Sequence, residues 1–123
     1  VNESPVYFTR TPSMRPLPMP VPIGVTHGDV GLLWQHTNIP AHSRLMVLAW
    51  LLDCFRPDPP FPVLELVGEQ GSAKSTTQSV LRSLVDPNKV MLRGRPKTVE
   101  DVFVAAANNW LVSYENLSGL TPE

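Results

Sequence analysis

The sequence predicts an α/β domain in which helices flank a parallel sheet, and three observations lead to this prediction. Short apolar runs suited to buried strands occur at 63–67, 90–92 and 110–114. Helical patterns at 75–85 and 99–108 separate these runs, which gives the alternating order of a parallel sheet with crossover helices. A glycine-containing turn joins the first strand to the helix that follows it.

The composition allows one modest core and restricts the partners of the protein. With 123 residues, 42% of them hydrophobic, the chain is in the range of one domain. A formal net charge of −1 gives the surface no general attraction to DNA or to anionic membranes, so a DNA contact would have to be local. The single cysteine, Cys54, excludes an intrachain disulfide, and no apolar run approaches the ~20 residues of a membrane span. We therefore expect a cytoplasmic protein without a membrane partner.

Two regions are expected along the chain, an extended arm at 1–25 and a domain at 26–123. The arm contains Pro5, Pro12, Pro16, Pro18, Pro20 and Pro22. Because proline lacks an N–H group and fixes φ, this arm should be extended and lie on the core or on a partner. A proline-rich ligand for an aromatic groove is the alternative. The domain should begin with a short helix at 29–35 and a buried core helix at 41–55, which is apolar around its whole axis.

The turn after the first strand has the layout of a phosphate-binding P-loop, with Lys74 and then Ser75 at the start of a helix. Glycines let backbone N–H groups turn toward one anion, and the helix adds its positive N-terminal end. Lys74 would supply a cation for the outer phosphates, and the Ser75 hydroxyl would bind magnesium. The expected phosphate-binding residues are Gly68, Gln70, Gly71, Ser72, Ala73, Lys74, Ser75 and Thr76. The alternative is a structural turn whose lysine faces solvent.

An acid at the end of a neighbouring strand would complete such a site. Glu115 follows the apolar run at 110–114 and is expected to hold magnesium together with Ser75. Lys74 and Glu115 are therefore the candidate catalytic residues. A nearby basic stretch contains Lys89, Arg93, Arg95 and Lys97. These cations are candidates for contacts with phosphates or DNA, although a solvated loop explains them equally well.

The runs GEQGSAKSTTQSVLRSLVDPN (68–88) and NNWLVSYENLSGL (108–120) resemble ATP-binding proteins of phages and integrative elements. Those proteins are similar to the helicase part of phage primase–helicases, in the superfamily III and AAA+ branch of P-loop NTPases. The resemblance covers about residues 50–120. It implies ATP and Mg²⁺ as cofactors, a Walker B role for Glu115, an association with DNA and a homo-oligomeric parent protein. The Ala73 before the lysine, where the usual motif has glycine, also recurs in the replicative MCM helicases.

The resemblance implies an incomplete P-loop NTPase domain, truncated after Walker B. Asn116 stands where many relatives carry a second acid that polarises the attacking water. The strands that carry a sensor residue and an arginine finger in such domains do not follow. We therefore expect ATP hydrolysis by the full-length parent and not by this chain alone. Two alternatives stay open: a non-catalytic assembly module with a vestigial loop, and a P-loop small-molecule kinase.

Overall fold

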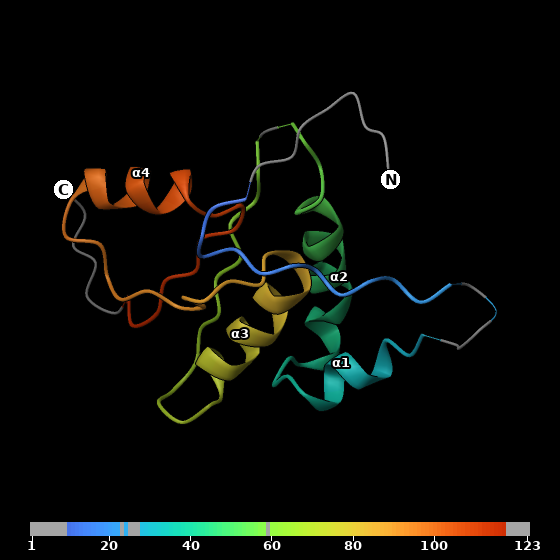
Figure 1. Cartoon of the computed structure of the whole chain (residues 1–123). Coiled ribbons are helices and arrows are strands. Elements are labelled where there is room, and N and C mark those ends of the chain that lie inside the picture. Colours follow the sequence, from blue (N-terminus) through green and yellow to red (C-terminus); the bar gives the residue numbers. More distant parts are fainter. Residues whose placement is uncertain (1–9, 23, 25–27, 59, 118–123) are drawn as a thin grey trace, which may run out of the picture.

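The structure, a computed structural model, describes residues 10–22, 24, 28–58 and 60–117 (Figure 1). Its helices are α1 (Gly31–Gln35), the 3₁₀ turn η1 (Ala41–Ser43), α2 (Arg44–Asp53), α3 (Lys74–Val85) and α4 (Val99–Ala107). Figure 1 shows α1, α2 and α3 grouped together and α4 set apart from them. Within the ranges given above, no helix is long and apolar enough to cross a membrane.

The helices lie close to where the sequence predicts them, because local signals mark their ends. Helix α3 begins at Lys74 and ends at Val85, directly before the Asp86–Pro87 pair that interrupts a helix. Helix α4 begins after Thr98, whose hydroxyl accepts the Asp101 N–H while the Asp101 carboxylate accepts the Thr98 N–H. This capping box confirms the predicted helix start. The predicted helix at 41–55 divides into η1 and α2.

A small apolar core joins α2 to α3. Its buried side chains are Ile39, Val47, Leu51, Leu81 and Val85, and the half-buried Leu33, Trp34, Trp50, Cys54, Leu64 and Leu111 pack against them. Each buried aliphatic side chain contributes about 1.5–3 kcal/mol to folding. The prediction that α2 is buried on every side is wrong. Only Val47 and Leu51 of this helix are buried, while Leu45 is 78% exposed and Leu52 is 73% exposed.

The predicted parallel sheet is also wrong. The described residues form no β-strand, and only two isolated bridges occur, an antiparallel one between Met14 and Asn88 and a parallel one between Arg93 and Tyr114. The helices are joined by long non-helical segments instead. The sequence predicted the α/β fold of a P-loop NTPase of the AAA+ or superfamily III type. The described residues do not have this fold.

The missing ladders have a physical cause, because side chains occupy the backbone groups that a sheet would use. The N–H groups of Trp110 and Leu111 both donate to Asp86 Oδ2, at 3.0 Å each. The Met91 carbonyl accepts from Arg82 Nη1 at 2.6 Å. The segment 63–67 makes no backbone-to-backbone hydrogen bond with any described residue. The apolar segments at 63–67, 90–92 and 110–114 therefore have the length of strands but do not pair with one another as a sheet.

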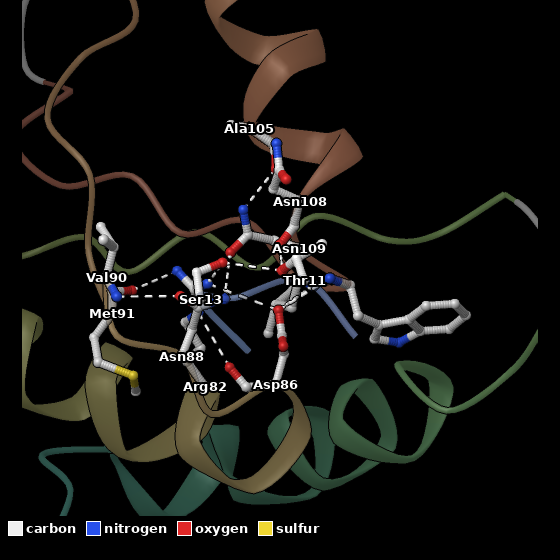
Figure 2. Close-up of polar contacts among 12 residues, drawn as sticks. Thr11, Ser13, Arg82, Asp86, Asn88, Val90, Met91, Ala105, Asn108 and Asn109 are labelled. Atoms are coloured by element: carbon white, nitrogen blue, oxygen red, sulfur yellow. Dashed lines mark hydrogen bonds and ion pairs between the residues drawn. The ribbon is translucent and has the colours of Figure 1, made fainter. Parts of the chain in front are cut away.

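These side chains belong to a buried polar cluster, the hub, formed by Arg82, Asp86, Asn88 and Asn109 (Figure 2). Arg82 is fully buried, and its Nη2 lies 2.7 Å from Asn109 Oδ1 and 3.7 Å from Asp86 Oδ2. Asn88 Nδ2 donates to the same Asn109 oxygen at 2.9 Å. Burial lowers the pKa of Arg82, while the neighbouring Asp86 carboxylate opposes this change.

The hub also holds the arm. The Lys89 N–H donates to the Ser13 carbonyl at 2.9 Å, and the Arg15 N–H donates to the Pro87 carbonyl at 2.8 Å. These bonds enclose the bridge between Met14 and Asn88. The part of the arm before residue 10 lies outside the described residues. The hub thus connects the arm, the end of α3 and the segment that follows α4.

Candidate functional site

The loop that precedes α3 has the backbone geometry of a tight turn around a small space. Gly71 has φ +82°, and Ala73, directly before the helix, is left-handed with φ +58° and ψ +26°. At Gly68, a Cβ atom would lie only 2.9 Å from Ser72 Oγ, so a larger residue would displace the Ser72 hydroxyl. Glycine is favoured at 71, because the backbone there has a positive φ.

Lys74 closes this loop upon itself. Its ammonium donates to the carbonyl oxygens of Gly68 at 2.7 Å and Glu69 at 2.5 Å, and to Ser72 Oγ at 3.2 Å. Ser72 Oγ in turn donates to the Glu69 carbonyl at 2.8 Å. The cation of the loop is thus held by neutral oxygens and has no carboxylate partner among the described residues.

The start of α3 presents unpaired backbone donors. The first hydrogen bond of the helix runs from the Thr77 N–H to the Ala73 carbonyl, at 2.9 Å. The N–H groups of residues 73–76 have no acceptor in the part of the chain that the structure describes. Such groups carry the positive end of the helix dipole and bind anions when they face a common point.

A carboxylate from a distant part of the sequence meets this helix start. Ser75 Oγ donates to Glu115 Oε2 at 3.1 Å. One turn further along α3, Gln78 Nε2 donates to the Tyr114 carbonyl at 2.8 Å. The parallel bridge supports the same segment, since the Glu115 N–H donates to the Arg93 carbonyl at 2.8 Å. The hydroxyl and carboxylate oxygens that the sequence pairs as magnesium ligands are therefore adjacent, and both are of the kind that Mg²⁺ prefers.

The other predicted loop residues occupy more exposed positions. Gly68, Gln70, Gly71, Ala73 and Thr76 are exposed, while Ser72 and Lys74 are half-buried. The Thr76 hydroxyl makes no hydrogen bond with the described residues. The loop is therefore open to solvent along its outer side, where a ligand could reach it.

The basic stretch 89–97 differs in exposure from the loop and from residue to residue. Lys89 and Lys97 are exposed, and neither side chain hydrogen-bonds the loop within the described ranges. Arg95 is exposed as well. Arg93 is half-buried, and its Nε atom is buried without a hydrogen-bond partner. The four cations thus sit in different environments, and their predicted role toward phosphate or DNA stays a prediction.

Asn38 also contacts the loop, and no sequence motif predicts this contact. Its Nδ2 donates to the Ser72 carbonyl and its backbone N–H donates to Thr77 Oγ1, both at 3.0 Å. Asn38 lies far from the loop in sequence, so no motif spacing includes it. Only the contact itself identifies this residue.

A separate cavity of about 140 Å³ lies between the end of α2 and the segment after α4. It is lined by Trp50, Asp53, Cys54, Phe61, Pro62, Trp110 and Leu111. Both indole N–H groups already donate to backbone carbonyls, Trp50 to Pro62 and Trp110 to Cys54. Burial, and then the nearby Asp53, raise the pKa of the Cys54 thiol, which keeps it protonated and unreactive. The cavity therefore offers an apolar wall with few free donors.

The fold and the loop define a small helical domain with a candidate anion-binding helix start. The family model for replication proteins of actinomycete integrative conjugative elements matches residues 30–123, and the chain belongs to this family. Neither a curated protein nor a solved structure matches the chain. The family links the protein to the replication of a mobile element. Residues 13–15, which pair with residues 87–89 at the hub, lie outside the matched range.

Proposed function

We propose that the loop 68–76 binds the phosphates of ATP, and that the chain is the nucleotide-binding part of a DNA-associated, helicase-like replication protein. The pair formed by Ser75 and Glu115 is the observation that carries the proposal. If the loop were only a structural turn, it would not need the Glu115 carboxylate, from a distant segment, beside Ser75. A magnesium nucleotide needs an oxygen ligand at that place.

The charges of the loop support phosphate as the ligand. The ammonium of Lys74 and the unpaired N–H groups of residues 73–76 are donors without an anionic partner among the described residues. A phosphate would accept from several of them, and charge-assisted bonds of this kind are stronger than bonds between neutral groups. On binding, the Lys74 ammonium would replace its bonds to the Gly68 and Glu69 carbonyls with bonds to phosphate oxygens, and it would stay at the same loop.

Magnesium would lie at the Ser75 and Glu115 oxygens and would neutralise charge on the outer phosphates. Ser75 would offer its hydroxyl and Glu115 its carboxylate, either directly or through a bound water. Asn116, which follows Glu115 with a positive φ of +55°, carries no acid for activating water. The proposal therefore assigns nucleotide binding to this loop and assigns no activation of water to Asn116.

A DNA-associated role rests on the family, whose members are replication proteins. ATP turnover by the protein is to be compared in the presence and absence of single-stranded DNA. A rise in turnover with DNA supports a helicase-like motor. Transfer of phosphate to a small acceptor, with no effect of DNA, would favour a small-molecule kinase instead.

The first prediction tests the loop through Lys74→Ala. Because hydrogen bonds to charged groups contribute about 1.5–3 kcal/mol, this change should weaken binding of ATP with Mg²⁺ roughly 10- to 150-fold. Isothermal titration calorimetry measures the dissociation constants. Lys97→Ala is the control, since it removes an exposed lysine whose side chain makes no hydrogen bond with the loop among the described residues. Equal affinity of the wild-type protein and Lys74→Ala would remove the loop from consideration as a nucleotide site.

A non-catalytic assembly module is the second candidate, and the exposed apolar side chains of α4 favour it. Val99 is 72% exposed, Phe103 is 71% exposed and Val104 is 59% exposed. Such a surface on a capped helix suits contact with another protein. Self-association seen by light scattering, together with no ATP binding by the wild-type protein, would support this candidate over the first.

A further inference from the structure

Asn38 lies between α1 and the apolar core, with contacts on both sides. The preceding Thr37 donates its hydroxyl to the Leu33 carbonyl at 2.7 Å, in the last turn of α1. The following residue, Ile39, is 6% exposed and belongs to the core. The backbone N–H of Asn38 itself donates to Thr77 Oγ1, which is 3% exposed. Asn38 therefore presents its side-chain amide from a fixed position, although it lies at the surface.

The side chain of Asn38 sets the orientation of one peptide of the loop. Its Nδ2 donates to the Ser72 carbonyl oxygen. In a trans peptide the C=O and the next N–H point in opposite directions, so the Ala73 N–H points away from Asn38. This N–H is the first of the four unpaired donors at the start of α3. With the Ser72 carbonyl turned the other way, an oxygen would face the anion in place of a donor.

The same bond keeps the Ser72 carbonyl apart from the helix. A regular α3 extended by one turn would pair this carbonyl with the Thr76 N–H, four residues later. Here Asn38 supplies the donor to Ser72, and the Thr76 N–H stays without an acceptor among the described residues. Asn38 thus helps to keep two donors of the loop open.

We propose that Asn38 is a positioning residue of the phosphate-binding loop, which holds the Ser72–Ala73 peptide with its N–H directed at the bound phosphate. The inference rests on the proposed function, because it names a residue that serves the same site. Asn38 would act through the peptide and would not itself need to touch the ligand. The alternative is a tie that only fastens α3 to the segment after α1.

The experiment compares the wild-type protein with Asn38→Ala and Asn38→Asp. The probes are ATP with Mg²⁺ and inorganic tripolyphosphate with Mg²⁺, measured by calorimetry. Loss of one neutral hydrogen bond should weaken both ligands about three- to tenfold and by the same factor, because the effect is on phosphate and not on the base. Asn38→Asp should weaken them further, since a carboxylate cannot donate to Ser72 and repels the anion.

A matched control and a second measurement separate positioning from folding. Gln35→Ala removes another exposed amide from the neighbouring α1 and should leave both affinities unchanged. In the wild-type protein, the amide resonance of Ala73 should move downfield on addition of tripolyphosphate, which tests the proposal even if the variants unfold. An unmoved Ala73 resonance, or wild-type affinity in Asn38→Ala while Lys74→Ala loses binding, would overturn the role of Asn38 alone. Absence of binding by the wild-type protein would overturn the proposed function, and this inference with it.

Discussion

At the scale of single residues, Ala73 has an unusual backbone for its type. Its φ of +58° lies in the left-handed region, which costs an L-residue with a Cβ about 1–2 kcal/mol compared with right-handed helix. The usual P-loop motif has glycine at this position, where the same conformation carries almost no cost. The loop therefore keeps its shape against a local strain, with the bonds of Lys74 and Asn38 holding it.

Ala73→Gly should consequently stabilise the protein. Relief of the left-handed strain should exceed the added flexibility of the unfolded chain, for a net gain of about 0.5–1 kcal/mol in the free energy of unfolding. Urea denaturation followed by tryptophan fluorescence measures this change.

Ala49→Gly is the matched control, because Ala49 is exposed in the right-handed α2. There the same substitution should cost about 0.5–1 kcal/mol, so the two variants should differ in sign. A loss of stability in both would show that Ala73 is not strained in solution.

The sequence predicts a glycine-containing turn before a helix, and the structure has such a turn at 68–73 before α3. The phosphate-binding roles of Gly68 to Ser75 stay predictions. The strand-end position of Glu115 led to an acid that does meet Ser75, although no strand is present. Asn38 could not be found in this way, because a side-chain contact between distant segments leaves no local pattern.

At the scale of elements, the helices follow from local signals and the strands do not. Capping, proline and glycine act within a few residues, so the sequence contains what determines α3 and α4. A strand needs a neighbour, and its neighbours are decided by the rest of the fold. In 90–92 and 110–114, side chains of the hub hydrogen-bond the backbone groups of Met91, Trp110 and Leu111, which therefore do not pair in a ladder.

The capping box of α4 predicts a dependence on pH. The backbone N–H groups of Lys97 and then Thr98 donate to the Asp101 carboxylate and hold its pKa below the usual value of about 3.9. A lowered folded-state pKa gives stability that is present above the unfolded pKa and is lost as pH falls through the folded pKa. The amide resonances of α4 should therefore stay constant from neutral pH to about pH 5 and report fraying below about pH 4.

Asp101→Asn should remove this acid-dependent change, since the amide does not titrate. Glu100→Gln is the control, because Glu100 lies in the same first turn and makes no capping bond among the described residues. If α4 frays in Asp101→Asn over the same pH range as in the wild-type protein, the acid-dependent fraying belongs to a group other than Asp101.

At the scale of the whole molecule, the hub adds polar ties between the end of α3, the segment at 88–91 and the segment after α4. The Arg82 guanidinium donates both to the Met91 carbonyl and to the Asn109 side chain, and it lies beside the Asp86 carboxylate. Removal of one partner from a buried charged group leaves the other uncompensated, which costs about 3–5 kcal/mol.

Arg82→Met should therefore lower the free energy of unfolding by about 3–5 kcal/mol, or prevent folding. Chemical denaturation measures the loss, and the dispersion of the NMR spectrum shows whether a fold is present. Arg56→Met is the control, because Arg56 forms an exposed ion pair with Asp53 at 2.8 Å. Surface pairs contribute about 0–1 kcal/mol, so a similar effect of both substitutions would contradict a special role for the hub.

The hub and the loop stand at opposite ends of α3, and one segment is fastened at both. Leu111 is tied to Asp86 beyond the C-terminal end, and Glu115 is tied to Ser75 at the N-terminal end. An extended run from 111 to 115 spans about 13 Å, and α3 between the two ties spans about 16 Å, a difference that side chains can cover. One residue more or fewer in this run would shift Glu115 by up to about 3.3 Å and move its carboxylate away from Ser75. The length of α3 therefore sets how many residues must lie between the contact of Leu111 with Asp86 and the contact of Glu115 with Ser75.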